Sequence, residues 1–369
     1  VEIHTKPGTN NLHGALFEFV RNDVFDARNY YRPQPLSKDI LERNQFGFVL
    51  SGPVLIPKVY NGRDRTFWMV NYEGQREKQE VASIASVAPD AFPTGDFSAL
   101  STPLRDPLGG TFAGNRIPAD RLSPISLRYL EIHPRPNLPG LASNLAGVEQ
   151  QINNINQVFA RGDHNIGNND KLFGRVATFR FDFPTIPINY FSPVNSRITA
   201  NNVVISETHI FSPTVINEAK IGFNRNWILR SNLRTNTNFN PESIGLTGIR
   251  AGLPPNDRPL NPLETGYVPM NLTGYLTIGD GDLLPDFNIS ETWQIVDSVT
   301  WTKGVHTLKA GIDFRRLRMD RAGANVPRGA FTFNGEITGN PVADFMIGYA
   351  GQSQSPEGIL PVEFRQQTY

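Results

Sequence analysis

The sequence predicts an all-β protein: a fragment of an antiparallel transmembrane β-barrel of about ten strands, which in isolation forms an open, curved sheet. Three observations support this fold class. Many segments alternate polar and apolar residues, 24 Phe residues outnumber every other aromatic type, and 32 Gly and 29 Pro residues punctuate the chain. Above all, the connections alternate between short and long, as short periplasmic turns and long extracellular loops do in outer-membrane barrels.

The two kinds of connection follow each other along the chain. Short turns are expected at 56–64, 167–170, 212–214 and 302–304. Long loops are expected at about 24–43, 88–154, 184–197, 231–290 and 320–328. Loops beyond ~15 residues are usually functional or disordered, and the turn formers spread through 88–154 indicate an ordered loop without a core.

Composition limits the classes of function. The 35 basic and 35 acidic residues balance, so the charge implies no nucleic-acid partner, and the absence of cysteine excludes disulfides and thiolate metal sites. No run approaches the ~18 apolar residues of a membrane helix, but barrel strands need an apolar residue only at every second position. The six histidines show no metal-ligand spacing, and the sequence implies no cofactor, metal or catalytic group.

The first strands are expected to have one apolar and one polar side. Ala15, Phe17 and Phe19 oppose Glu18; Phe46, Phe48 and Leu50 oppose Gln45, Gly47 and Ser51; Trp68, Val70 and Tyr72 oppose Asn71 and Glu73. Segments 171–183 and 198–210 have apolar residues on both sides, so the sequence leaves their lipid-facing side open. A period of two is the mark of a half-buried strand.

The later strands alternate most regularly. Ala219, Ile221, Phe223, Trp227 and Leu229 oppose Glu218, Lys220, Asn224, Asn226 and Arg230; Trp293, Ile295, Val299 and Trp301 oppose Thr292, Gln294, Ser298 and Thr300; Leu308, Ala310, Ile312 and Phe314 oppose Lys309, Gly311, Asp313 and Arg315. Asp297 is the exception on the apolar side of its strand. The tryptophans near strand ends fit an interfacial aromatic girdle, or alternatively the core of a β-sandwich.

A wide barrel needs a polar inner wall, and six charged residues are candidates for it. The candidate lumen-facing residues are Glu18, Glu73, Lys220, Lys309, Asp313 and Arg315. The alternative is that these residues are solvated charges on the surface of a soluble sheet. Two short helices are also expected, each with an N-cap and a first-turn proline, at Ser123-Pro124 and Asn340-Pro341. We expect the first to anchor a long outer loop and the second to lie at a strand junction.

Several motifs resemble one family in the order in which they occur. They are Lys6-Pro7-Gly8-Thr9-Asn10 and the following 12–23, Arg43-Asn44-Gln45-Phe46-Gly47, Ser51-Gly52-Pro53, Asn71-Tyr72-Glu73-Gly74, Gly95-Asp96-Phe97-Ser98, Gly114-Asn115-Arg116-Ile117-Pro118, 300–309 and Gly339-Asn340-Pro341-Val342-Ala343-Asp344-Phe345. The chain resembles the Oar-like TonB-dependent receptors, outer-membrane transporters common in acidobacteria, over nearly its whole length.

The resemblance implies a plugged barrel of about 22 strands that imports an extracellular substrate with energy transmitted by TonB. Residues 1–10 would be the end of the plug domain, as its last strand, and 11–369 the N-terminal part of the barrel, with long loops at about 88–154 and 231–290. The implied partners are TonB, reached through a region missing here, the lipid of the cell outer membrane, and a substrate of unknown class.

Two other classes of function remain as alternatives. A secreted or surface β-rich module, such as a glycan-binding adhesin, would share the Gly-, Asn- and Phe-rich loops but would bury its apolar strand sides. An enzyme is disfavoured because no nucleophile elbow or phosphate-binding loop is present. Asp280-Gly281-Asp282 with Asp286 offers carboxylates for calcium, although Asp-Gly pairs are ordinary turn formers and a turn is the preferred interpretation.

Overall fold

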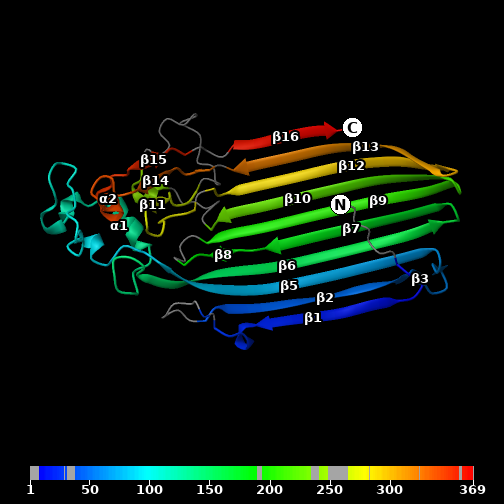
Figure 1. Ribbon diagram of the computed structural model, residues 1–369, viewed down its shortest axis with the longest axis horizontal. Coiled ribbons are helices and arrows are strands. Elements are labelled where there is room, and N and C mark those ends of the chain that lie inside the picture. Colours follow the sequence, from blue (N-terminus) through cyan, green and yellow to red (C-terminus); the bar gives the residue numbers. More distant parts are fainter. Residues whose placement is uncertain are drawn as a thin grey trace.

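The computed structural model describes residues 8–28, 30, 38–188, 193–233, 241–247, 265–281, 283–323, 325–356 and 360–368, the side chains of 360 and 361 excepted. Within these residues, ten long strands lie side by side in one sheet (Figure 1). The strands are β1 His13–Asn22, β2 Ile40–Pro53, β5 Thr66–Ala85, β6 Leu145–Ile166, β7 Asp170–Asp182, β9 Val194–Ser212, β10 Val215–Asn232, β12 Asp286–Lys303, β13 His306–Gly323 and β16 Leu360–Thr368.

The strands are antiparallel and neighbours in sequence are neighbours in space, with β1 and β16 at the two edges. A short strand, β8 Thr185–Ile186, pairs with β6 and β9 beside this path. The sheet is therefore an open up-and-down meander, and the predicted fold class is confirmed. Among the described residues, no helix is long and apolar enough to cross a membrane.

The predicted alternation of connections is also confirmed. The short turns gather at one end of the sheet and the long connections at the other (Figure 1). The turn between β12 and β13 shows why these joins are tight: Lys303 pairs with His306, leaving only two residues between them. Gly304 takes a φ of 61° at the first of these positions, where the lack of a Cβ removes the steric cost. The turn between β2 and β5 holds a small hairpin of β3 Leu55–Ile56 and β4 Tyr60–Asn61.

Most predicted loop bounds are within about five residues of the observed ones, but two loop ends are wrong by more. Strand β6 begins at Leu145 rather than after 154, so the preceding loop is 86–144. Its first half, 149–157, is rich in Gln and Asn on both faces and therefore has no apolar side to reveal it as a strand. The connection after β13 extends from 324 to 359 rather than from 320 to 328.

Parts of three long loops fold together into one body at the end of the sheet, which we call the cap: 86–144, 265–281 and 325–356. Its elements are η2 Phe92–Thr94, η3 Ala113–Asn115, η4 Ala119–Arg121, α1 Pro124–Glu131, β11 Met270–Leu272, β14 Ala330–Phe333, α2 Pro341–Ile347 and β15 Gln352–Gln354. Strands β11, β14 and β15 form a small sheet of their own. The connection between β1 and β2 forms η1 Asp23–Phe25, outside the cap. Leu246, which follows η5 Pro241–Ile244, packs in the cap core.

The cap has a hydrophobic core, contrary to the expectation of an ordered loop without one. Phe92 and Phe97 are fully buried, with ring centroids 4.0 Å apart, and pack in the same core as Val268 and Phe345 from the other two loops. The Tyr129 hydroxyl donates to the Val268 carbonyl at 3.1 Å, and burial raises the pKa of this tyrosine. Long-range contacts between loops build this core, and no local pattern in any one loop encodes it.

Both helices begin where predicted, and both belong to the cap. Ser123 caps α1 and the Asn340 side chain accepts from the amides of Val342 and Ala343 at the start of α2. Helix α2 connects β14 to β15 of the small sheet, so it does lie at a strand junction, but one inside the cap. It packs against α1, where the Ser126 hydroxyl donates to the Phe345 carbonyl at 2.5 Å.

Two of the motifs that carry the family resemblance pair with each other in the cap. The Phe97 amide donates to the Asn115 carbonyl at 2.9 Å, and Asp96 forms a bridge with Arg116. The Asn115 side chain accepts from the Leu104 amide at 2.8 Å and donates to two further carbonyls. These motif residues therefore stabilise the cap. Their contacts with each other account for the spacing of the two motifs, and no bound ligand is needed to explain it.

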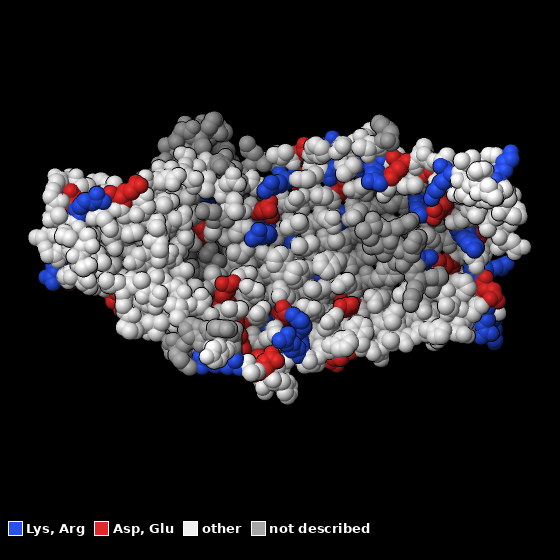
Figure 2. Space-filling view, viewed as in Figure 1, with Lys and Arg blue, Asp and Glu red and all other residues white. Residues whose placement is uncertain are grey.

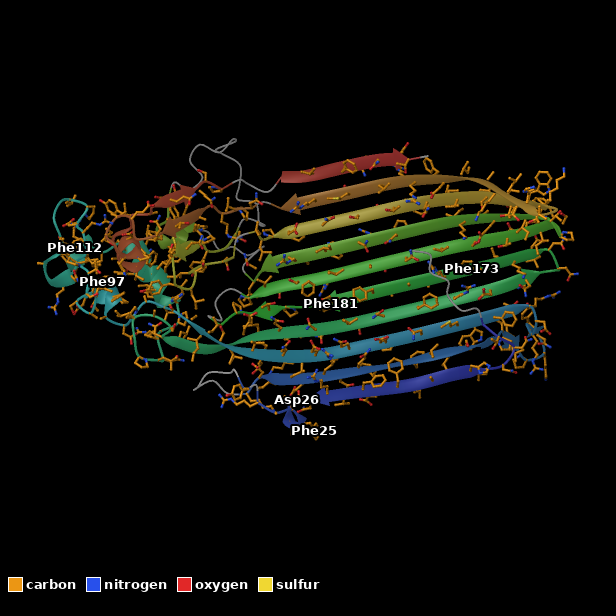
Figure 3. The ribbon with its side chains drawn as sticks, in the orientation of Figure 1. Phe25, Asp26, Phe97, Phe112, Phe173 and Phe181 are labelled. Carbon is orange, nitrogen blue, oxygen red and sulfur yellow. The ribbon has the colours of Figure 1, made fainter. Side chains whose placement is uncertain are left out.

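Replacing Phe97 with alanine should open the cap and leave the sheet folded. Removing a fully buried phenylalanine costs about 3–5 kcal/mol, whereas Phe25→Ala, at a side chain that is 90% exposed, is the matched control. Both side chains are labelled in Figure 3. Limited proteolysis should cut the cap of Phe97→Ala much faster than that of the control. Equal cutting rates would contradict the packed cap.

Acid should weaken the cap through His133. Its side chain is 8% exposed, and burial lowers the pKa to about 4. In the unfolded cap the histidine pKa is near 6.5, so the unfolded cap binds the proton more readily than the folded cap. The free energy of unfolding of the cap is therefore at its full value above about pH 6.5. It falls by about 3 kcal/mol as the pH drops towards 4. Hydrogen exchange of cap amides at pH 7 and pH 4.5 measures this loss. His133→Leu should reduce it and His306→Leu, at an exposed turn, should not.

Candidate lumenal wall and membrane face

The pairing register assigns every strand residue to one of two sheet faces, because residues directly opposite each other in a ladder point to the same side. Followed from β5 to β13, the register places Trp68, Trp227, Trp293 and Trp301 on one face. These are all the tryptophans of the chain. We call this side the Trp face and the other side the polar face.

The Trp face is apolar in the half of the sheet next to the short turns. Phe223 and Trp293 lie on it with ring centroids 4.6 Å apart, and Ile221 pairs with Ile295 on the same face. These side chains are exposed although they are large and apolar: Trp293 is 52% and Ile221 52% accessible. An exposed apolar surface of this extent, with tryptophans near its margins, is what a membrane-facing barrel wall requires.

Five of the six candidate wall residues share the polar face. They are Glu73, Lys220, Lys309, Asp313 and Arg315. Glu18 does not join them: it pairs with Phe46 and lies on the Trp face, where it accepts from the Asn44 side chain at 3.1 Å. Local alternation around Glu18 suggested the reverse because Phe17 and Phe19 lie on the polar face. The six residues therefore do not form one wall.

Hydrogen bonds and ion pairs between charged and amide side chains stabilise the polar face. Gln45 donates to Glu73 at 2.6 Å, and Asp313 accepts from Arg315 at 2.7 Å and from Gln294 at 2.9 Å. Figure 2 shows acidic and basic side chains intermixed over the strands and few charges on the visible side of the cap. Such a surface suits water or another polar surface and carries no single sign of charge to select an ion.

The register also decides the two strands that the sequence left open. Leu172 and Val176 of β7, and Val203 and Ile205 of β9, lie on the Trp face. The apolar residues on the other side include phenylalanines at the end of and just after β7, together with Ile198, Val204 and Ile210 of β9. Phe179, Phe181 and Phe183 follow one another at every second position, and the Phe181 and Phe183 rings stack at 4.4 Å. Figure 3 places Phe181 and Phe173 along this strand, and the Arg161 guanidinium lies 4.3 Å from the Phe173 ring centroid.

The chain reaches β1 from the polar face. Gly8 is buried against Phe67, a polar-face residue, so closely that an added Cβ would meet the Phe67 Cβ at 2.5 Å. The Asp64 amide donates to the Asn10 side chain at 2.7 Å, which fixes this segment at a short turn. Of the predicted plug strand 1–10, residues 1–7 lie outside the described residues, and the assignment to a plug stays a prediction.

Beyond the apolar half, towards the cap, the Trp face becomes charged, and several of its charges form ion pairs. Arg225 contacts Glu291 at 3.2 Å and Arg318 contacts Asp320 at 2.7 Å. Strands such as β5, with 20 residues, exceed the ~10 residues needed to cross a membrane. We therefore assign this paired region to the part of the sheet outside the hydrocarbon layer.

The suggested calcium carboxylates have protein partners. Asp280 is fully buried and accepts from the Tyr267 amide at 2.7 Å, and Asp286 accepts from Arg321 at 3.3 Å. Asp282 lies outside the described residues. Among the described groups, the carboxylates of Asp280 and Asp286 do not converge with a third metal ligand. The contacts give Asp280 a structural role inside the cap.

An open antiparallel meander with one tryptophan-rich apolar face and unequal ends defines an outer-membrane β-barrel protein. The sequence comparison agrees: residues 4–369 match the family described as "Outer membrane beta barrel domain", and the chain belongs to that family. The protein is accordingly located in the outer membrane. This location favours the membrane barrel over a secreted, water-soluble binding module.

Other comparisons add little. No curated protein sequence matches the chain. Among solved structures, the outer membrane transporter YddB from Escherichia coli superposes with a TM-score of 0.43 and 7% identity, covering 89% of this chain and 30% of that chain. This likeness is too distant to indicate a function, and the chain spans less than a third of that transporter.

A charge should be tolerated on one face of β10 and not on the other. Arginine at a mid-membrane, lipid-facing position of a barrel costs about 2–4 kcal/mol. We expect the free energy of unfolding to fall by this amount for Ile221→Arg on the Trp face. For Asn224→Arg on the polar face we expect almost no change. Urea unfolding of the barrel in lipid vesicles, followed by tryptophan fluorescence, measures both. Equal losses, or a larger loss for Asn224→Arg, would reverse the assignment of the faces.

Proposed function

We propose that the chain is part of the barrel of an Oar-like TonB-dependent receptor, which binds an extracellular substrate and imports it through a plugged barrel with energy from TonB. The observation that carries this proposal is the open sheet: ten consecutive strands keep β1 and β16 as edges and present a polar face. A barrel that needs further strands to close is wide, and a wide barrel encloses either an aqueous channel or a plugged lumen. The plug itself is implied by the family resemblance.

The order of the sequence motifs gives the proposal its family, and two further features are compatible with it. The segment Gly8–Asn10 approaches β1 along the polar face, as a chain leaving a plug inside the barrel would. In this arrangement Glu73, Lys220, Lys309, Asp313 and Arg315 line the lumen, where they contact water or the plug. Glu18 is not part of this lining, because it lies on the Trp face.

The roles of the parts follow from this placement. The cap lies at the extracellular end, where a substrate first meets the protein, and TonB acts from the periplasmic side through the plug region. The proposal assigns no catalytic step and no cofactor. The cap offers packed loops of mixed polarity, so the class of substrate is left to experiment.

The plug is the testable part of this proposal. The full-length protein in planar lipid bilayers should be closed or nearly so, because the plug fills the lumen. A variant lacking the plug that the resemblance predicts ahead of Gly8 should form wide, long-lived channels. In a titration, the soluble periplasmic domain of TonB should bind to the intact receptor. Open, porin-like conductance of the intact protein, together with no binding of TonB, would reject the proposal.

A further inference from the structure

Three potential metal ligands converge at the short-turn end of the Trp face: Asp170, Glu207 and His209. One donor atom from each side chain lies within 4.8 Å of the donor atoms of the other two. The His209 Nδ1 is 2.5 Å from the Asp170 Oδ1. The group lies outside the candidate lumenal wall, on the opposite face of the sheet.

The geometry of the sheet fixes this convergence. Glu207 and His209 are two residues apart on β9, and residues at i and i+2 of a strand point to the same face. Asp170, the first residue of β7, is the direct ladder partner of His209. The backbone hydrogen bonds of two adjacent strands therefore place all three donors before any ligand arrives. The spacing of histidines in the sequence did not reveal this, because Asp170 is brought in by the register.

The imidazole is also held from the side by an aromatic ring. The Phe211 and His209 ring centroids are 4.2 Å apart at an interplanar angle of 69°. This edge-on contact restricts rotation of the histidine ring, whose Nδ1 is directed at the Asp170 carboxylate. The three side chains are half-buried, so the group forms a shallow site with one side open to the surroundings.

The charge balance of this group differs from that of the acids on the Trp face near the cap. Arginines pair with Glu291, Asp320 and Asp182 near the cap. At the short-turn end, no lysine or arginine of the described residues forms an ion pair with Asp170 or Glu207, and the Glu207 carboxylate accepts no hydrogen bond from them. Two carboxylates beside an apolar membrane surface favour a compact counter-cation.

We propose that Asp170, Glu207 and His209 bind a divalent transition-metal ion of the Zn²⁺ type at the periplasmic rim of the barrel. One imidazole and two carboxylates are a donor set that suits Zn²⁺, which in open sites takes three protein ligands and a water. Hard cations such as Ca²⁺ need more oxygen ligands than this group supplies. Bound metal joins β7 to β9 at their ends and takes the place of the hydrogen bond between His209 and Asp170.

A direct metal titration tests the site. The full-length protein, purified in detergent and stripped with a chelator, is titrated with Zn²⁺ by calorimetry. We expect one saturable site in the wild type and a loss of at least ~10-fold in affinity for His209→Gln and for Glu207→Gln, since even indirect perturbation of metal ligands costs that much. His306→Gln, at an exposed turn beyond these strands, is the matched control and should bind like the wild type.

Substitution of Co²⁺ gives a second, spectroscopic readout: its visible absorption bands should be present in the wild type and absent in both ligand variants. Heat-modifiable migration on gels shows which variants are folded, and Asp170→Asn replaces any variant that is not. Absence of saturable Zn²⁺ binding, or equal affinity in the wild type and all folded ligand variants, would overturn the site. Neither result bears on TonB or on the plug, so the two proposals are tested separately.

Discussion

The continuous backbone hydrogen bonding between antiparallel neighbours is the constraint on which the rest of this structure depends. Lipid offers no partner for a free amide or carbonyl, so a membrane sheet must pair its strands along their length. The β12–β13 ladder runs without interruption from Asp286 opposite Gly323 to Lys303 opposite His306. Since a shift of one residue would exchange the two faces, this register places the tryptophans outward and holds the charged residues together on the other side.

The cap depends on the sheet in a different way. Loops of 86–144 and 325–356 would be too long to stay ordered individually. The sheet brings the ends of these loops together at the same end of the strands, and so reduces the entropy that is lost when the loops associate. Phe97, Val268 and Phe345, from three separate loops, then share one core. A hydrogen bond also joins two of the loops: Arg105 of the first loop donates to the carbonyl of Glu336, in the last loop, at 2.7 Å. The cap is consequently a tertiary structure built on the strand ends.

The sequence predicted what is local and missed what is long-range. Alternation located β10 and β13 and their faces, since each has a nearly complete apolar side, and the proline after each N-cap located both helices. Glu18 was misplaced because alternation separates two faces without saying which joins the apolar face of the neighbouring strand. For β7, with Phe181 on one face and Val176 on the other, only the pairing with β9 decides. The cap core and the group around His209 arise from contacts that no single segment contains.

The dimensions of the Trp face connect these features to a membrane. On β12 the apolar stretch from Trp293 to Trp301 contains Asp297, whose charge is met by the Asn217 side chain at 2.5 Å. Eight residues at ~3.3 Å each give about 26 Å along the strand, or roughly 20 Å across the membrane at a typical tilt of ~40°. With one further residue at each end, this approaches the ~25 Å apolar band of such barrels. Glu291, paired with Arg225, lies just beyond that band on the cap side, so the ion pairs near the cap begin where the hydrocarbon ends.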